Sequence, residues 1–319
     1  MKKLLLNILA TCVIFNVSVM GQETGYGPGY QFAIMANPAF SGSEGVGTLR
    51  FSYLNFYPGN HFGLNSFFSS YDWSVAELHG GAGVWLANDY IGDIVNDFRG
   101  GLSYAYYLKA GKELYINAGL SASLFHRGFS MRNAVFPDQI DPLGGVSIPT
   151  AEIPDAGGKT AFDIGTGFLL IYRKFFGGLS LSHLSQPYLS IRSGTDDRLL
   201  RKLSVNGAYD ISFGTVTLRP VGFFELQGGQ LSTSAGAVFE IDRMSVNTII
   251  GNDNSENIDM QAGLSFSTGF FSFFYNYRFN LRSENVMMPF SLLHQTGLSF
   301  SLNNVDKRKK TGTIRFPKM

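Results

Sequence analysis

The chain has 319 residues, of which 15% are charged and 14% are aromatic, and it contains 38 glycines. Soluble domains usually carry about a quarter charged residues, so this composition favours a β-rich protein that presents an apolar outer band to lipid. The formal net charge of +1 gives no support for nucleic-acid binding. After residue 21 no run of about 18 consecutive apolar residues occurs, which argues against a helical membrane span.

The N-terminus has the layout of a signal peptide. Two lysines precede an apolar stretch, residues 4–19, and small residues stand before Gln22. A membrane anchor is one alternative, but the apolar run is short and is interrupted by polar residues. A lipoprotein signal with lipidated Cys12 is the other, but the threonine before Cys12 is a poor fit and the apolar run continues past it. Residues 1–21 are therefore predicted to be cleaved. Cys12 is the only cysteine, so the mature chain would have no disulfide, thiolate metal site or Cys nucleophile.

Residues 22–47 form a leader segment before the first predicted strand. The segment is rich in aromatic and aliphatic residues, which makes it too apolar for a free tail. We expect it to fold back and line or obstruct the periplasmic mouth of a barrel. A short helix at residues 31–35 would be stopped by Asn37 and Pro38, because the residue before a proline disfavours the helical conformation. A disordered leader is the alternative.

Alternation of apolar and polar residues predicts strands along most of the remaining chain. In residues 270–280, five aromatic side chains occupy one face, and Asn276, Arg278 and Asn280 share the other with Phe274. The predicted segments have the length of tilted membrane strands. They are fourteen in number, near residues 48–57, 62–73, 80–89, 97–108, 112–126, 160–173, 175–184, 200–211, 214–226, 230–241, 243–251, 256–268, 270–280 and 292–303.

The joints between these strands alternate in length from the second strand onward. Short joints occur at residues 109–111, 174, 212–213, 242 and 269, and long polar joints at residues 89–96, 127–159, 185–199, 251–255 and 281–291. Tight periplasmic turns and long external loops are the barrel pattern, whereas a soluble β-sandwich has no reason to sort its loops in this way. The sequence therefore predicts an all-β, antiparallel, up-and-down transmembrane β-barrel of residues 48–303. Pro220 fits a strand interior poorly and would need a bulge or a strand end.

Charged residues of both signs gather on the predicted inner face. We expect them to form ion pairs within the lumen; the alternative is that they only keep the lumen wet. Arg278 fixes the orientation of its strand, because an arginine facing lipid near mid-bilayer costs about 2–4 kcal/mol. The predicted lumen-facing polar residues are Asp97, Arg99, Glu113, Asp163, Lys202, Asp210, Asp259 and Arg278.

Several short motifs occur in an order that resembles one family. These are "YQFAIMANPAFSG" at residues 30–42, "GGLSLSHLSQP" at 177–187, "LRPVG" at 218–222, "FFYNYRFNL" at 273–281 and "HQTGLSFSL" at 294–302. Over about residues 22–303 the chain resembles the PorP/SprF family of Bacteroidota outer-membrane proteins of the type IX secretion and gliding machinery. It departs from the commoner Tyr-x-Tyr-Asp and His-Glu forms at Arg278 and Gln295, which leaves the subfamily and the cargo open.

The resemblance implies a non-enzymatic barrel that assists secretion or anchors exported proteins at the cell surface. Partners implied by the family are periplasmic ring and lipoprotein components and, in SprF-like members, large secreted adhesins. A channel for small solutes or hydrophobic ligands, and a soluble β-sandwich that binds a partner, are the alternatives. No HExxH pair or G-x-S-x-G elbow occurs, and no enzyme, cofactor or metal site is predicted.

The long joints are the predicted partner surface. Apolar residues of the joint at 127–159 and of the joint at 281–291 are the candidate contacts, namely Phe136, Ile140, Leu143, Ile148, Met287 and Met288. A lid that only closes the barrel mouth is the alternative. Residues 304–319 form a basic tail that would dock a periplasmic component or rest on anionic headgroups, unless its charges are merely solvated.

Overall fold

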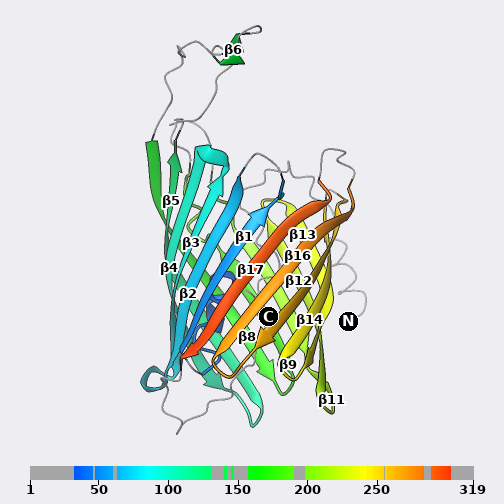
Figure 1. The fold of residues 1–319 in the computed structure, drawn as a ribbon. Coiled ribbons are helices and arrows are strands. Elements are labelled where there is room, and N and C mark those ends of the chain that lie inside the picture. Colours follow the sequence, from blue (N-terminus) through cyan, green and yellow to red (C-terminus); the bar gives the residue numbers. More distant parts are fainter. Residues whose placement is uncertain are drawn as a thin grey trace, which may run out of the picture.

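Fourteen antiparallel staves close into one β-barrel (Figure 1), where a stave is one strand of the wall or two short strands that follow each other in line. The computed structural model describes residues 32–45, 47–59, 63–130, 140–141, 145–146, 157–189, 198–254, 256–283 and 289–302. Each stave pairs with the neighbour that follows it in the sequence, and pairing of the first and last strands closes the ring. The predicted up-and-down transmembrane barrel is confirmed.

The strands of the barrel match the predicted segments one for one. β10 and β11 together make one stave, because both pair with β12. The strands are β1 (Gly47–Phe56), β2 (Leu64–Val75), β3 (Gly80–Ile91), β4 (Val95–Lys109), β5 (Leu114–Phe129), β8 (Gly157–Tyr172), β9 (Phe175–Ser182), β10 (Lys202–Tyr209), β11 (Ile211–Phe213), β12 (Val216–Gln227), β13 (Gln230–Ile241), β14 (Met244–Asp253), β15 (Ile258–Ser267), β16 (Phe271–Arg282) and β17 (Ser291–Leu302).

The remaining elements are short. Inside the barrel lie the helix α2 (Ala33–Ala36) and the 3-10 helix η2 (Pro38–Phe40). The 3-10 helices η3 (Ala76–Leu78) and η4 (Gly92–Ile94) join wall strands, and β6 (Ile140–Asp141) pairs with β7 (Gly145–Val146) above the rim (Figure 1). Among the described residues, no helix has the length and apolar character needed to cross a bilayer.

Long joints and short turns lie at opposite ends of the barrel, as the joint lengths indicate (Figure 1). Two connections depart from the pattern. The predicted long joint at residues 89–96 is wrong, because β3 and β4 extend into it and only η4 (Gly92–Ile94) joins them. β12 and β13 are joined at the long-loop end by only Gly228 and Gly229, with φ of 58° and 81°. Glycine populates this left-handed region without steric cost, so a two-residue hairpin forms where a longer loop is otherwise usual.

The two faces of each strand have different chemistry. Outward side chains form an apolar belt in which Leu102, Leu120 and Leu124 are exposed by 65%, 62% and 56%. On β16 the residues Phe274 and Asn276 point inward and are buried, at 6% and 1% exposure. This arrangement has the apolar-out and polar-in alternation of a membrane barrel.

Pro220 sits on β12 where the opposite stave breaks. β10 pairs with β12 as far as Ala208 and Val221, and β11 resumes pairing at Ile211 and Leu218. Proline has no backbone N–H to give to a ladder, so the missing donor coincides with the interruption between β10 and β11. A break in the neighbouring stave therefore accommodates Pro220, rather than a bulge in its own strand.

Candidate functional site

An inner segment, residues 32–45, crosses the inside of the wall from strand to strand. Its central residue is Asn37, whose side-chain Nδ2 donates to the main-chain oxygens of Phe168 (3.1 Å) and Leu179 (3.3 Å). The Asn37 Oδ1 accepts from the N–H of Ala39 at 2.9 Å and so caps η2. The backbone N–H of Asn37 donates to the oxygen of Ala33 at the end of α2, while its side chain caps η2 and fixes the segment to β8 and β9.

Glycines of the wall allow the main chain of the inner segment to approach closely. A Cβ atom on Gly119 would collide with Pro38 and Ala39, and one on Gly81 would collide with the oxygen of Ser41. Asn117 Nδ2 donates to the oxygen of Ala39 at 3.3 Å. Only glycine leaves room at these contacts, so the wall strands β3 and β5 are shaped to receive this segment.

Polar groups fix the end of the inner segment that leads to β1. The N–H of Gly42 donates to Asp72 Oδ2 at 2.8 Å. Arg50 forms ion pairs with both Asp72 and Glu44, and the Tyr107 hydroxyl donates to the oxygen of Ser41. Asp72 is 1% exposed, so its charge depends on these partners.

Apolar side chains complete the seat of the inner segment, by which we mean its set of contacts with the barrel wall. The ring of Phe32 meets that of Phe68 edge to face at 4.8 Å, and Phe40 meets Phe176 at 6.3 Å. Both inner-segment rings belong to the buried apolar cluster of the barrel. The inner segment is therefore held by hydrogen bonds, ion pairs and apolar contacts together. The short helix that we expected at residues 31–35 is α2, which begins two residues later than predicted and ends one residue later, at Ala36.

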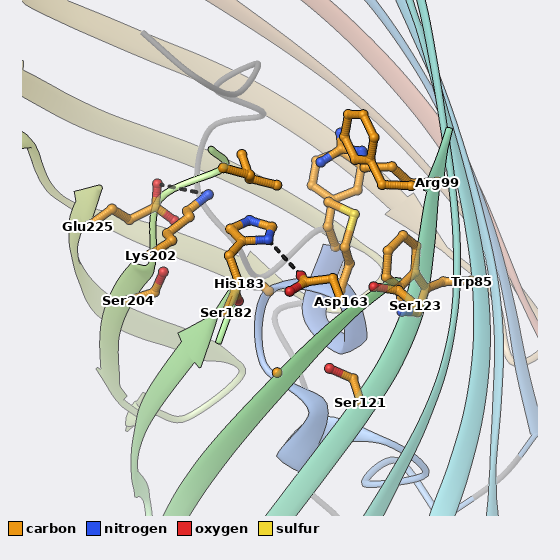
Figure 2. Close-up of a pocket in the computed structure, with 16 residues that line it drawn as sticks. Trp85, Arg99, Ser121, Ser123, Asp163, Ser182, His183, Lys202, Ser204 and Glu225 are labelled. Carbon is orange, nitrogen blue, oxygen red and sulfur yellow. Dashed lines mark hydrogen bonds and ion pairs between the residues drawn. The ribbon is translucent and has the colours of Figure 1, made fainter. Parts of the chain in front are cut away.

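A polar cavity lies on the other side of α2. Phe32, Met35 and Ala36 form its floor, and the rest of its lining comes from the long-loop halves of the wall strands. About 70 Å³ of this space can hold the centres of water molecules. Figure 2 shows Lys202 and Glu225 on one side and Trp85 on the other.

The charged groups of this cavity are paired. His183 Nδ1 lies 2.7 Å from Asp163 Oδ2 (Figure 2). The Ser185 hydroxyl donates to Asp163 Oδ1 at 2.7 Å. Lys202 Nζ lies 3.8 Å from Glu225 Oε2. His183 has a left-handed φ of 58°, which is uncommon for a residue other than glycine. That backbone turn at the end of β9 aims its ring at β8.

Each of the eight predicted lumen residues has an ionisable partner, which is an oppositely charged residue in seven cases and His183 in the case of Asp163. Seven of them lie on the inner wall or at its strand ends, and Glu113 lies at the rim, in the turn before β5, because its strand begins one residue later. The pairs are Asp97 with Arg127 (2.7 Å), Arg99 with Asp89 (2.6 Å), Asp163 with His183 (2.7 Å), Lys202 with Glu225 (3.8 Å), Asp259 with Arg278 (3.4 Å), Asp210 with Arg219, and Glu113 with Arg173.

Several predicted segments fall outside the described residues. These are the signal peptide at 1–21, most of the leader before residue 32, the basic tail at 304–319, and the contact candidates Phe136, Leu143, Ile148, Met287 and Met288. Of Ile140 only the backbone, in β6, is described. The partner surface therefore stays a prediction.

The prediction from sequence missed a row of buried amides along the inner wall. Asn247 Nδ2 donates to Asn276 Oδ1 at 2.9 Å, Asn276 Nδ2 to Gln295 Oε1 at 3.3 Å, and Gln295 Nε2 to Ser52 Oγ at 3.3 Å. This row links β14 and β16 to β17 and β1, where the barrel closes. The available signal was that these amides have the inward position in their strands. The sequence predicted pairing in the lumen for charged side chains only.

Solved structures with this fold include transport proteins. The chain resembles the CymD monoaromatic hydrocarbon channel (13% identity, TM-score 0.53, covering 89% of this chain and 95% of that one). It also resembles the Ralstonia pickettii toluene transporter TbuX (12%, 0.51, 90% and 98%) and the P. putida toluene transporter TodX (11%, 0.51, 86% and 94%). At these identities the likeness shows the barrel fold alone.

No curated protein matches the chain. The family model described as "Type IX secretion system membrane protein PorP/SprF" matches residues 25–287. This match includes the inner segment with Asn37 and every wall strand up to β16, and it agrees with the resemblance of the motifs. The chain belongs to the PorP/SprF family of type IX secretion system membrane proteins.

Proposed function

We propose that this chain is a non-enzymatic outer-membrane component of the type IX secretion system that assists secretion or surface anchoring of exported proteins. The family match over residues 25–287 is the observation that carries the proposal. In this proposal residues 1–21 are a cleaved export signal, residues 22–47 fill the barrel interior, residues 48–303 form the barrel, and the basic tail at 304–319 faces the periplasm.

The seat of the inner segment supports a role at the barrel ends. Asn37 and Asp72 hold the segment against four wall strands from inside, so a protein partner is offered the loops rather than an open lumen. At the long-loop end, β5 and β8 are each 16 residues long and lead to the β6–β7 hairpin (Figure 1). We expect this region and residues 284–288 to contact the partner.

The first test is removal of the gene from the bacterium that encodes the chain, followed by a count of exported proteins at the cell surface and in the medium. The proposal expects loss of one or more exported proteins from the surface, with restoration by the intact gene. Unchanged export and surface display in the deletion strain would contradict it.

A second test identifies the contact surface. A tagged chain would be purified from native membranes with its partners, and residues 131–156 would be exchanged for a short Gly-Ser linker. The matched control replaces the turn Asp242–Arg243 at the opposite end. We expect the loop exchange to lose the partner and the turn exchange to keep it; retention by both would remove this loop from the contact surface.

A small-solute or hydrophobic-ligand channel is the second candidate. The solved structures named as channels and transporters share its fold. In our proposal the inner segment, which lies inside the barrel, obstructs the path that such a channel would need. Uptake of sugars or aromatic compounds by liposomes that contain the purified barrel would favour the channel. Recovery of the bare barrel from native membranes, together with such uptake, would replace the secretion proposal.

A further inference from the structure

The cavity beside α2 is bordered on one side by the inner segment. Its floor is the inner segment, through Phe32, Met35 and Ala36, and its polar wall comes from strand ends on the long-loop side, with Arg99 near the start of β4 and Glu225 near the end of β12. A space closed below by a seated segment is suited to hold a ligand rather than to pass one.

The lining contains a buried donor. The indole nitrogen of Trp85 has no hydrogen-bond partner among the described residues, and the residue is only 7% exposed. The nitrogen itself has almost no accessible surface, so Trp85 contributes its ring to the lining of the cavity and no hydrogen bond to a ligand.

The charged groups of the lining are already paired within the wall. Arg99 pairs with Asp89, Lys202 with Glu225, and Asp163 with His183, and each pair has at least one member that borders the space. An ion of either sign would compete with these pairs and meet like charges. A purely apolar ligand would strip water from paired charges, which is costly. The lining therefore favours a neutral ligand with many polar groups.

Hydroxyl groups meet this requirement. Each can donate to a carboxylate and accept from an ammonium, so several hydroxyls bridge the existing pairs without breaking them. Trp85 and Phe125 supply aromatic surface in the same lining, against which an apolar sugar face packs. The water-sized space of about 70 Å³ corresponds to several waters, since one needs about 10–15 Å³, and one sugar unit replaces several waters.

We infer that this cavity is a carbohydrate-binding site, which takes a neutral sugar unit from the long-loop side of the barrel. Glu225 and Asp163 accept from the hydroxyls of the sugar, Lys202 donates to them, and the ring of Trp85 packs against the sugar. The site requires only the seated inner segment and does not depend on a role in secretion. The sugar can come from a free saccharide or from a polysaccharide of the cell surface, which share this chemistry.

The chain offers a built-in probe, because it has only two tryptophans. Trp73 points outward on β2 and is 36% exposed, so Trp73→Phe leaves Trp85 as the only indole. The W73F protein in detergent would be titrated with neutral mono- and disaccharides, and separately with polysaccharide released from the outer membrane of the same bacterium. We expect a saturable change in Trp85 emission, and the arm that binds more tightly identifies the source.

Two further variants test the lining. Glu225→Gln removes the charge of a cavity acceptor, whereas Glu256→Gln removes a carboxylate of the rim pair with Arg282, whose side chains are 66% and 63% exposed. Loss of a hydrogen bond to a charged group predicts about tenfold weaker binding for E225Q and unchanged binding for E256Q. Heat-modifiable mobility confirms that each variant is folded, and calorimetry on the unaltered chain repeats the titration without any substitution.

Several results would overturn the inference. The first is that no neutral saccharide gives a saturable signal in either fluorescence or calorimetry. The second is that charged probes such as aspartate or lysine bind more tightly than any neutral saccharide. The third is that the E225Q and E256Q proteins bind the saccharide with equal affinity. Saturable binding of a saccharide that weakens only in E225Q supports the site.

Discussion

Asn37 of the inner segment lies so close to Gly167 of β8 that a Cβ atom on residue 167 would collide with the Asn37 side-chain oxygen. The same amide donates to the main-chain oxygen of Phe168, the next residue along β8. The Asn-Pro motif that marks the leader in the sequence is thus the point at which that leader is attached to the wall, and the attachment needs a glycine on the other side.

Gly167→Ala should loosen the inner segment. The added methyl pushes Asn37 away from the wall and breaks its bonds to Phe168 and Leu179, so we expect unfolding in urea to require about 1–3 kcal/mol less free energy. Gly222→Ala is the control, since a Cβ there meets nothing within 4 Å. Equal stability of the two variants would show that Asn37 can shift without loss.

Deletion of residues 23–36 should open the barrel. It removes α2 and Phe32, which form the floor of the polar cavity, and single-channel conductance in planar bilayers should rise. The matched control deletes 14 residues of the tail, from about residue 306 onward, which leaves every described strand intact. A folded deletion variant whose conductance equals that of the control would rule out an obstructing role for the inner segment.

Arg50→Met should destabilise the barrel strongly. The buried Asp72 carboxylate loses its ion pair with Arg50 and keeps the hydrogen bond from the N–H of Gly42. Breaking a buried ion pair in this way costs about 3–5 kcal/mol. Arg173→Met breaks the exposed pair with Glu113, where water replaces the lost partner, so no measurable change is expected. The comparison uses urea unfolding in lipid vesicles, and a small effect of Arg50→Met would show that Asp72 is rehydrated.

Gln295→Leu should weaken the seam at which the barrel closes. The substitution leaves Asn276 and Ser52 with unmet polar groups in a buried place, at a cost of about 1–3 kcal/mol. Asn252→Leu replaces an exposed amide on the outward face of β14 and should leave stability unchanged. The temperature at which the heat-modifiable band shifts on a gel measures both, and equal shifts would mean that the amide row adds nothing.

Leu120→Arg tests the assignment of the faces. Leu120 is exposed on the outer face at the middle of β5, and an arginine facing lipid near mid-bilayer costs about 2–4 kcal/mol. Ser232→Arg is the control, because residue 232 points inward beside Glu225 and Asp253. Folding yield into vesicles should fall only for the first variant; tolerance of both would mean that the predicted lipid band is misplaced.

Much of the barrel was predictable because its signals are local. A period of two residues separates the faces of a strand whatever its neighbours are, so Tyr277 and Arg278 could be assigned to opposite faces before any pairing was known. The resemblance of short motifs supplied the family, which the family match shows. Glu113 illustrates the limit, since it has inward parity but lies beyond the end of its strand.

The amino-acid sequence by itself determined the number of strands and the face on which each side chain lies, because both depend on neighbours within a few residues; two of the connections at the long-loop end are shorter than predicted. Only the tertiary structure decided that Arg278 meets Asp259, that Asn37 bonds to Phe168, and that Trp85 borders a polar cavity with Glu225. These contacts join residues from different strands, and their distances depend on strand register and barrel closure, which no local pattern specifies.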